Sequence, residues 1–373
     1  MNKNKKASGG LLRNNAVQSL LASVICIVLG IFVGYLVLLL INPAGAGGAI
    51  INILKNFLYY PSAVKAMQYF GSTLVKTAPL LMCSLSVLFA YKVGLFNIGA
   101  AGQYVAGAGA ALYFALAFKM PWYVCVVAAI VIGGILGAIS GFLKAYCNVN
   151  EVISCIMLNW ISLYIVNMLL NTVKDPSSPY TANLSSVNEK AMLPQVGLNN
   201  VFANNKYVSI AIPLAVVMAI VVWIVLEKTK LGYELRATGI NKQAAKYCGM
   251  REKYNIILTM IISGGLAGMG AAFYYLTGME QWAVTQTSVP GMGFNGIAAA
   301  FLGGLNPIGT IFASYFIQHI TSGGAYVDKS MYCSQISDFI SALIIYLCGF
   351  VFFFKLWLNR VLDKREEKKG GKA

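Results

Sequence analysis

Long apolar runs separated by short polar segments are the feature of this sequence that most limits its possible folds. The first run, 17–41, is longer than the roughly 20 residues that a helix needs to cross a bilayer, and too long for the core of a signal peptide. Only 11% of the residues are charged and 58% are hydrophobic, a composition foreign to soluble domains. The sequence therefore predicts an all-α, polytopic integral membrane protein. About ten transmembrane helices are expected, at 17–41, 72–91, 97–118, 121–145, 151–172, 207–226, 255–277, 291–304, 307–322 and 335–357.

Basic residues set the expected orientation of these helices. The net charge is +16, and lysines and arginines gather in the N-terminal tail 1–16, the segment 228–254 and the C-terminal tail 358–373, which places these three in the cytoplasm. Segments 42–71 and 173–206 are then outside, the first with an interfacial helix at about 54–70. We expect one transmembrane domain, 1–373, with both termini cytoplasmic. Charges confined to loops and tails indicate no nucleic-acid partner.

Glycines and prolines add two structural expectations. Pairs of small residues four apart let helix backbones approach closely. They occur at Gly30/Gly34, Gly133/Gly137/Gly141 and Gly264/Gly268. The sequence 303–307 (GGLNP), between the two short runs near position 300, is expected to break the helix there.

The segment 227–254 is the longest strongly charged interval between apolar runs. Asn241 has the position of a helix N-cap, 242–248 of a short helix, and Gly249 of its C-terminal stop. Ala244 and Ala245 are expected on the surface of this helix. The segment is predicted to be either a solvated loop or a docking helix for a cytoplasmic partner.

A short motif occurs twice, at 96–103 (FNIGAAGQ) and at 294–300 (FNGIAAA). We call these the first break and the second break. Paired interrupted helices in two pseudo-repeated halves of a transporter point to a substrate pathway, because half-helix ends present unpaired backbone groups. Chance is the alternative, since Phe, Asn and Gly are frequent in this chain.

Several kinds of chemistry are missing from the sequence. No G-x-x-x-x-G-K-[ST] pattern is present to bind ATP phosphates. The eight cysteines include no C-x-x-C and there is one histidine, so no zinc site or disulfide framework is expected. Carboxylates that could couple ion flow are few: Asp338, Glu151 and, in an outer loop, Glu280. An ion-driven carrier using Asp338 or Glu151 is one alternative, but a partner that hydrolyses ATP accounts better for the segment 228–254.

Three stretches, 94–103 (GLFNIGAAGQ), 150–160 (NEVISCIMLNW) and 293–303 (GFNGIAAAFLG), resemble the nucleoside branch of bacterial ABC-importer permeases. That superfamily also contains ribose-type and branched-chain amino-acid permeases. The sequence departs from the pattern at Ala101, where the family often has glutamate. The central segment resembles the family's coupling loop, which seats on the ATPase, at Gly232, Arg236, Gly239, Asn241, Ala244, Ala245 and Gly249.

The resemblance implies the permease subunit of an importer in the bacterial plasma membrane, with no enzyme activity, catalytic residue, metal site or cofactor of its own. The implied partners are an ABC ATPase subunit, a second permease subunit and an extracytoplasmic substrate-binding lipoprotein, besides membrane lipids. The expected cargo is a nucleoside, with a simple sugar, riboflavin or an amino acid as alternatives.

The expected pathway residues carry rings or neutral amides, which can hydrogen-bond a base or ribose without desolvating a charge. They are Phe96, Asn97, Gln103, Asn159, Phe294 and Asn295. The alternative is that these amides cap or bridge helices.

Overall fold

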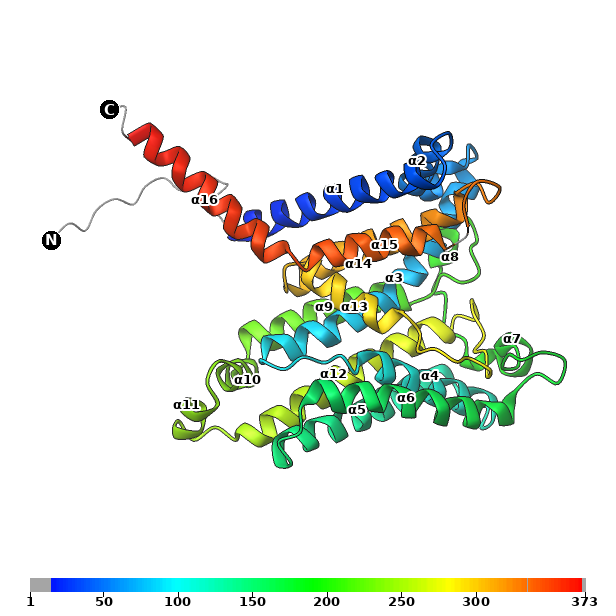
Figure 1. Ribbon diagram of the computed structural model, residues 1–373. Coiled ribbons are helices and arrows are strands. Elements are labelled where there is room, and N and C mark those ends of the chain that lie inside the picture. Colours follow the sequence, from blue (N-terminus) through cyan, green and yellow to red (C-terminus); the bar gives the residue numbers. More distant parts are fainter. Residues whose placement is uncertain (1–14, 334, 371–373) are drawn as a thin grey trace. The chain divides into compact units, whose positions relative to one another are not determined.

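In a computed structural model, the residues described are 15–333 and 335–370, and most of them are helical (Figure 1). In chain order the α-helices are α1 (Asn15–Ile41), α2 (Ala46–Lys55), α3 (Ala63–Lys92), α4 (Ala100–Leu116), α5 (Trp122–Tyr146), α6 (Glu151–Leu170), α7 (Leu184–Val187), α8 (Leu198–Val201), α9 (Ala211–Lys228), α10 (Lys230–Ile240), α11 (Lys242–Tyr247), α12 (Glu252–Tyr275), α13 (Met292–Leu302), α14 (Pro307–Gly323), α15 (Ile336–Cys348) and α16 (Val351–Gly370). In these residues, β-structure is limited to isolated bridges joining Lys174 to Thr181 and Tyr180 to Ala283. The all-α prediction is confirmed.

Six of the described helices are long and apolar enough to cross a membrane: α1, α3, α5, α6, α9 and α12. Each coincides with a predicted span. Four further predicted runs form the shorter helices α4, α13, α14 and α15. The chain is thus a multi-pass membrane protein, while the number of ten crossings stays a prediction.

Two predicted helices are wrong in extent. The interfacial helix at 54–70 is divided, because α2 ends at Lys55 and α3 begins only at Ala63. Pro61 lies between them; it has no backbone N–H and keeps its predecessor out of helical geometry. The last predicted span, 335–357, is also divided, since α15 ends just before Gly349, a poor helix former. The predicted break between the two short helices near 300 is confirmed, with α13 ending at Leu302 and α14 starting at Pro307.

The described chain forms two compact units. The first contains the described residues up to 56, residues 301–304 and those from 320 on. Within it α1 packs on α15, and a Cβ added to Gly34 would come within 3.2 Å of the Ile340 side chain. The Tyr332 hydroxyl donates to the carbonyl of Asn42 at 2.6 Å, which ties the loop before α15 to the end of α1.

The second unit, residues 57–300 and 305–319, is built around α12. Its helices approach so closely that backbone touches backbone. A Cβ on Gly264 of α12 would lie 2.2 Å from the carbonyl oxygen of Gly133 in α5, and one on Gly268 would lie 2.2 Å from that of Ala129. From the other side, a Cβ on Gly107 of α4 would lie 2.4 Å from Cα of Gly268. The packing role predicted for these glycines of α5 and α12 is confirmed.

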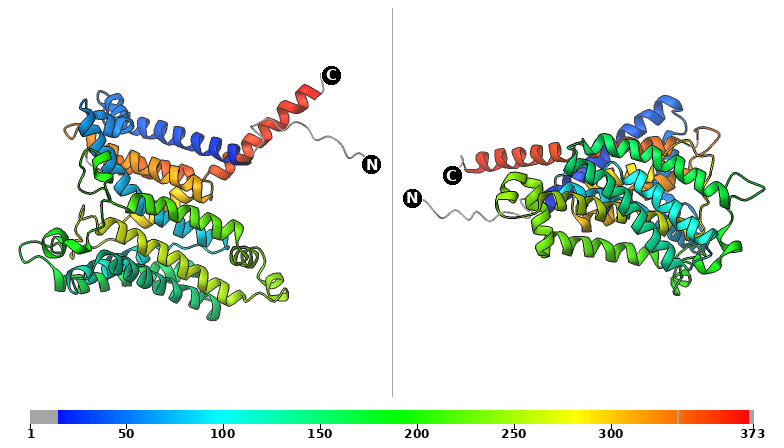
Figure 2. Two further views of the ribbon diagram at one scale, coloured as in Figure 1. Left: turned by 180° about the vertical axis from the view of Figure 1, so that it is seen from behind. Right: turned by 90° about the horizontal axis from the view of Figure 1, so that it is seen from below.

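The two ends of the second unit carry different structures. Helices α10 and α11 project at the end where α9 finishes and α12 begins (Figure 1). The irregular segment with α7 lies at the opposite end, and both further views keep the two apart (Figure 2). The loop 276–291, which follows the last residue of α12, belongs to this opposite end.

Candidate functional site

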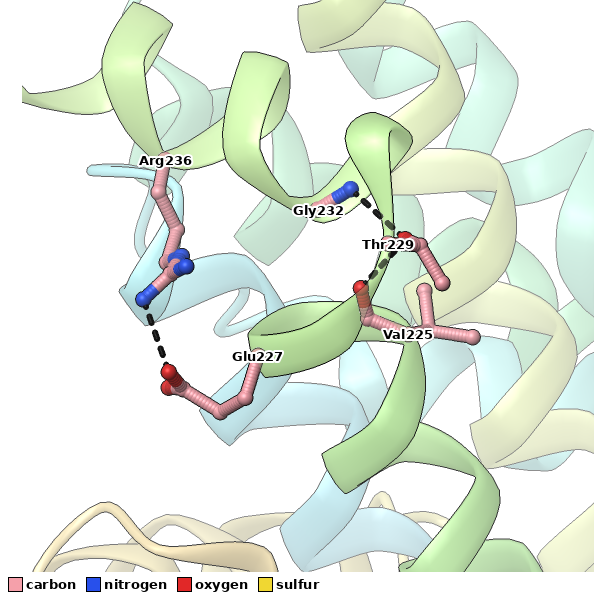
Figure 3. Close-up of polar contacts among 5 residues, drawn as sticks. All are labelled: Val225, Glu227, Thr229, Gly232 and Arg236. Carbon is pink, nitrogen blue, oxygen red and sulfur yellow. Dashed lines mark hydrogen bonds and ion pairs between the residues drawn. The ribbon is translucent and has the colours of Figure 1, made fainter.

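The corner between α9 and α10 is tightly built. The Thr229 hydroxyl donates to the carbonyl of Val225 at 2.6 Å and accepts from the Gly232 amide at 3.1 Å (Figure 3). A Cβ on Gly232 would lie 2.0 Å from the Val225 oxygen. Glycine at this position is therefore required by close packing, which explains one of the coupling-loop residues expected from sequence.

Arg236 of α10 points back toward α9. Its Nη1 donates to Oε2 of Glu227 at 2.9 Å (Figure 3). Both side chains are about one-third exposed, 32% and 37%, so this pair contributes little free energy by itself. Its geometry nevertheless directs the Arg236 guanidinium to the chain's own helix.

The far end of α10 rests on two other elements. The buried Asn255 amide of α12 donates to the Thr238 hydroxyl at 2.8 Å. A Cβ on Gly239 would lie 2.3 Å from the backbone of Val93, in the turn that precedes the first break. Gly239 lies inside α10 without a positive φ, so glycine is required here by close packing and not by a turn. Helix α10 is consequently fixed to α9, to α12 and to the first break.

The predicted short helix is confirmed as α11. The Asn241 side chain accepts from the Ala244 amide at 3.0 Å, and Gly249 has φ +80°. Ala244 is exposed, as expected, but Ala245 is 3% exposed. The expectation of a surface position for Ala245 is wrong, since its side chain faces the chain's own interior.

The exposed surface of this region combines apolar and basic side chains. Ile240 is 87% exposed and Tyr247 92%, and Lys242 and Lys246 are exposed beside them. We call this surface, Ile240 and the exposed residues 241–244 and 246–249, the α11 tip. Large apolar side chains left this open on a rigidly held helix are typical of a docking surface.

The first break is closed by a buried polar network. The Asn97 side chain is 0% exposed; its Nδ2 donates to Oε1 of Gln103 at 2.7 Å and to Oγ of Ser263 at 2.6 Å. Gln103 returns a hydrogen bond to Oδ1 of Asn97 at 3.2 Å. Ser86 of α3 and Ser263 of α12 are 2.9 Å apart. The network thus joins α3, α4 and α12 around Asn97.

Asn159 of α6 forms hydrogen bonds to the backbone of the same break and is not part of this network. Its Oδ1 accepts from the Gly102 amide at 2.8 Å and its Nδ2 donates to the Ile98 carbonyl at 3.2 Å. The side chain is 2% exposed. Asn97, Gln103 and Asn159 therefore bridge helices in this conformation.

The second break is more open. Phe294 is 40% exposed and Asn295 is half-buried. The Asn295 side-chain amide has no hydrogen-bond partner among the residues that the structure describes. Phe96, the counterpart of Phe294 in the first break, is half-buried.

The two breaks lie against each other. A Cβ on Gly293 would lie 2.3 Å from Cα of Ala101, and one on Gly296 would lie 2.8 Å from Cβ of Cys83. The similar sequences therefore meet in space as well. Gly293 of α13 packs on Ala101, the position at which this sequence departs from the permease pattern.

Two of the carboxylates singled out in the sequence differ in their surroundings. Oε2 of Glu151 lies 2.8 Å from Nζ of Lys144, an ion pair across the turn between α5 and α6. Glu280 lines a cavity together with Tyr274 and Tyr275. Sequence reasoning missed these two tyrosines; their position at the end of an apolar run, typical of a membrane–water interface, was the available signal.

Long apolar helices whose backbones touch, with a basic helix pair at one end, define a multi-pass membrane protein. Comparison with known proteins is more specific. The chain belongs to the family of branched-chain amino acid transport system permease components, whose model matches residues 69–349. As a member of this family it is a transport subunit and not an enzyme.

Relatives with curated names match over most of the chain. It is 32% identical to the guanosine ABC transporter permease NupP of Bacillus subtilis, over 88% of this chain and 92% of that protein. It is 30% identical to the nucleoside ABC transporter permease NupB of Lactococcus lactis, over 96% and 100%. A second Bacillus subtilis guanosine permease, NupQ, is 27% identical over 66% and 78%.

Proposed function

We propose that this chain is the permease subunit of an ATP-driven importer for nucleosides in a bacterial plasma membrane. The similarity to NupP and NupB over 88% and 96% of the chain carries the cargo assignment. That one species has two similar permeases, NupP and NupQ, supports a second, related permease subunit as a partner. A substrate-binding lipoprotein delivers the cargo on the outer side.

The α11 tip is the surface that we assign to the ABC ATPase. Ile240 and Tyr247 are its apolar anchors, and the neighbouring lysines face a negatively charged partner surface. Because α10 is packed on the turn before the first break, a push on the tip reaches the helix bundle without passing through a flexible linker. This anchoring supports a docking role over that of a solvated loop.

The same surface sets the orientation. The segment 227–254, which carries α10 and α11, is rich in lysine and arginine, and such residues favour the cytoplasmic side. The tails 1–16 and 358–373 are basic in their own right, so we place both termini in the cytoplasm as well. The loop 276–291, at the end of the second unit opposite to α10 and α11, then faces outward.

The pathway residues divide into two groups. Phe294 and Asn295 are accessible, so we assign them to cargo contact, together with the half-buried Phe96. Asn97, Gln103 and Asn159 hold the first break in shape. An ion-driven carrier using Asp338 or Glu151 is not retained, because the family is that of permease components and the Glu151 carboxylate is paired with Lys144.

Uptake in cells tests the function. A host strain without nucleoside uptake receives this chain together with the proposed ATPase, second permease and binding protein from the same organism. We expect accumulation of radiolabelled guanosine that stops when the ATP-binding lysine of the ATPase is replaced. Uptake of ribose, riboflavin or leucine in place of a nucleoside would overturn the cargo assignment, and uptake independent of the ATPase would overturn the importer.

A further inference from the structure

A cavity of about 320 Å³ lies at the end of α12 opposite to α10 and α11, a size in the range of small-molecule pockets. Tyrosines of α4 and α12 and polar side chains of the loop 276–291 line it. Those that matter here are Tyr104, Tyr274, Tyr275, Glu280, Gln281 and Gln286. We call it the tyrosine cavity. Neither lysine nor arginine is among its lining residues in the described chain.

Two buried tyrosines in this cavity have hydroxyls without a hydrogen-bond partner. Tyr104 is 1% exposed and Tyr275 5%, yet neither hydroxyl has a hydrogen-bond partner among the described residues. The two hydroxyls are not fully enclosed by protein. In the described residues, the side-chain polar atoms that are enclosed and lack a partner belong to Ser162 and Arg236, and not to these tyrosines. Buried polar groups are normally satisfied, so these hydroxyls are available to a ligand.

Glu280 stands at the rim of the cavity, where it is exposed. The Tyr274 hydroxyl donates to its Oε2 and so fixes the direction of the carboxylate. No cation among the described residues pairs with it. An ionised carboxylate has about four acceptor positions, so Glu280 can still accept two or more hydrogen bonds from a ligand.

The loop that carries Glu280 is held in place. Nε1 of the fully buried Trp282 donates to Oδ1 of Asn167 in α6 at 2.8 Å, and Nδ2 of Asn167 donates to the Gln286 carbonyl at 2.8 Å. The Thr181 amide donates to the Trp282 carbonyl at 2.9 Å. The cavity is thus preformed, which lowers the entropy cost of binding.

We propose that the tyrosine cavity is a binding site of the permease itself for the incoming nucleoside, with Glu280 as its specificity-determining residue. This inference rests on the proposed function. The ring of Tyr180, which also lines the cavity and is 45% exposed, can stack on a base. The free hydroxyls and the glutamine amides can hydrogen-bond a neutral ligand. The carboxylate of Glu280 accepts from two adjacent donors of the ligand.

A nucleoside offers such a donor pair at two places. One is N1–H with the 2-amino group of guanine, and the other is the 2′,3′-diol of ribose. A phosphate group is excluded by repulsion from Glu280, with no basic residue in the cavity lining to offset it. The cavity therefore admits nucleosides and rejects nucleotides.

Equilibrium binding tests the site apart from the lipoprotein. Radiolabelled guanosine is bound to the full-length chain, purified with its ATPase and second permease in lipid nanodiscs without the binding protein. Unlabelled inosine, which lacks the 2-amino group, 2′-deoxyguanosine and guanosine monophosphate compete. Because Glu280 is a charged but exposed partner, we expect Glu280→Gln to weaken guanosine binding about 10-fold. Tyr104→Phe and Tyr275→Phe each weaken it about 3- to 10-fold.

The competitors identify the donor pair. If the base edge is recognised, Glu280→Gln removes the preference for guanosine over inosine; if the diol is recognised, it removes the preference over 2′-deoxyguanosine. Glu189→Gln, an exposed carboxylate outside the cavity, and Tyr123→Phe, an exposed tyrosine, are the matched controls.

Two results overturn the inference. The first is that the wild-type complex in nanodiscs binds no guanosine although cells carrying the importer take guanosine up. The second is that Glu280→Gln has the same affinity and the same preferences as the control Glu189→Gln. Failure of the wild-type importer to take up any nucleoside is a separate result, which overturns the proposed function.

Discussion

The first and second breaks have similar sequences and opposite surroundings. Asn97 is fully buried and bonded to Gln103 and Ser263. Asn295 is half-buried, and its side-chain amide is without a partner in the described chain. One motif thus builds a closed clamp in one half of the bundle and an accessible surface in the other. A sequence echo of this kind predicts where helices are interrupted, but not which interruption faces the cargo.

The two breaks also differ in what they touch. The turn before the first break packs on Gly239 of α10, and so joins the α11 tip. The second break contacts the first through Gly293 and Ala101, and α3 through Gly296 and Cys83, and it lies farther from the tip. Force from a partner at the tip would arrive at the closed clamp before it reaches the open surface.

Asn97→Leu should have the largest effect. It removes the shared partner of Gln103 and Ser263 and leaves buried polar groups unpaired, at about 1–3 kcal/mol for each such group and less where lipid-embedded helices find other partners. We expect a loss of about 2–4 kcal/mol in stability and a poor yield of folded protein. Thermal unfolding of the purified chain measures it. Wild-type stability would show that the network is dispensable.

Gly239→Ala should come next, because its Cβ would lie 2.3 Å from the backbone of Val93. Overpacking of this kind costs about 1–3 kcal/mol. Gly47→Ala is the matched control, since its Cβ meets nothing within 4 Å; it should stabilise α2 by about 0.5–1 kcal/mol. Equal unfolding temperatures for the two variants would contradict the close contact between α10 and the turn before the first break.

Ala244→Trp tests the connection from the tip. Ala244 is exposed, so the large ring leaves folding intact but crowds a fitted partner contact. The expected cost of about 1–3 kcal/mol corresponds to a roughly 5- to 150-fold loss of ATPase association. Co-purification of the ATPase and guanosine uptake are measured together. As a control, Lys246→Ala at an exposed neighbouring position should change both by less than about 5-fold. If Ala244→Trp left co-purification unimpaired, α11 would not be a docking helix.

Asn295→Leu should have the smallest effect on stability, within about 0.5 kcal/mol, because no hydrogen bond of its side chain is lost. Uptake should nevertheless fall, since an amide facing the cargo is removed. Thermal unfolding and uptake rate on the same preparation decide it. A stability loss as large as that of Asn97→Leu would make the two breaks equivalent.

Local interactions explain what could be predicted from the sequence. Asn241 and Gly249 act within one turn of α11, so their positions predict its start and its stop. Glycines spaced four apart similarly predict the face of α5 that meets α12. The resemblance to permeases was confirmed by the family match over residues 69–349.

What could not be predicted depends on residues far apart in the chain. Ala245 is buried because one face of the six-residue helix α11 packs against neighbouring elements. The sequence of α11 alone does not determine which face that is. Gly239 is small because of Val93, more than a hundred positions earlier. The tyrosine cavity joins Tyr104 to Tyr275 and Glu280 across three elements. Contacts between residues so far apart in the sequence leave no periodic pattern from which they could be predicted.

The contact at Gly268 has a mechanical consequence. Helices α4 and α5 touch it from two sides with backbone alone, through Gly107 and Ala129. Helices commonly slide in small steps when side chains between them change rotamer, but here no side chain intervenes. We therefore expect α4, α5 and α12 to move as one rigid body during a transport cycle, with Gly268 as their common contact. The helix motion that opens a path must then occur between other helices of the bundle.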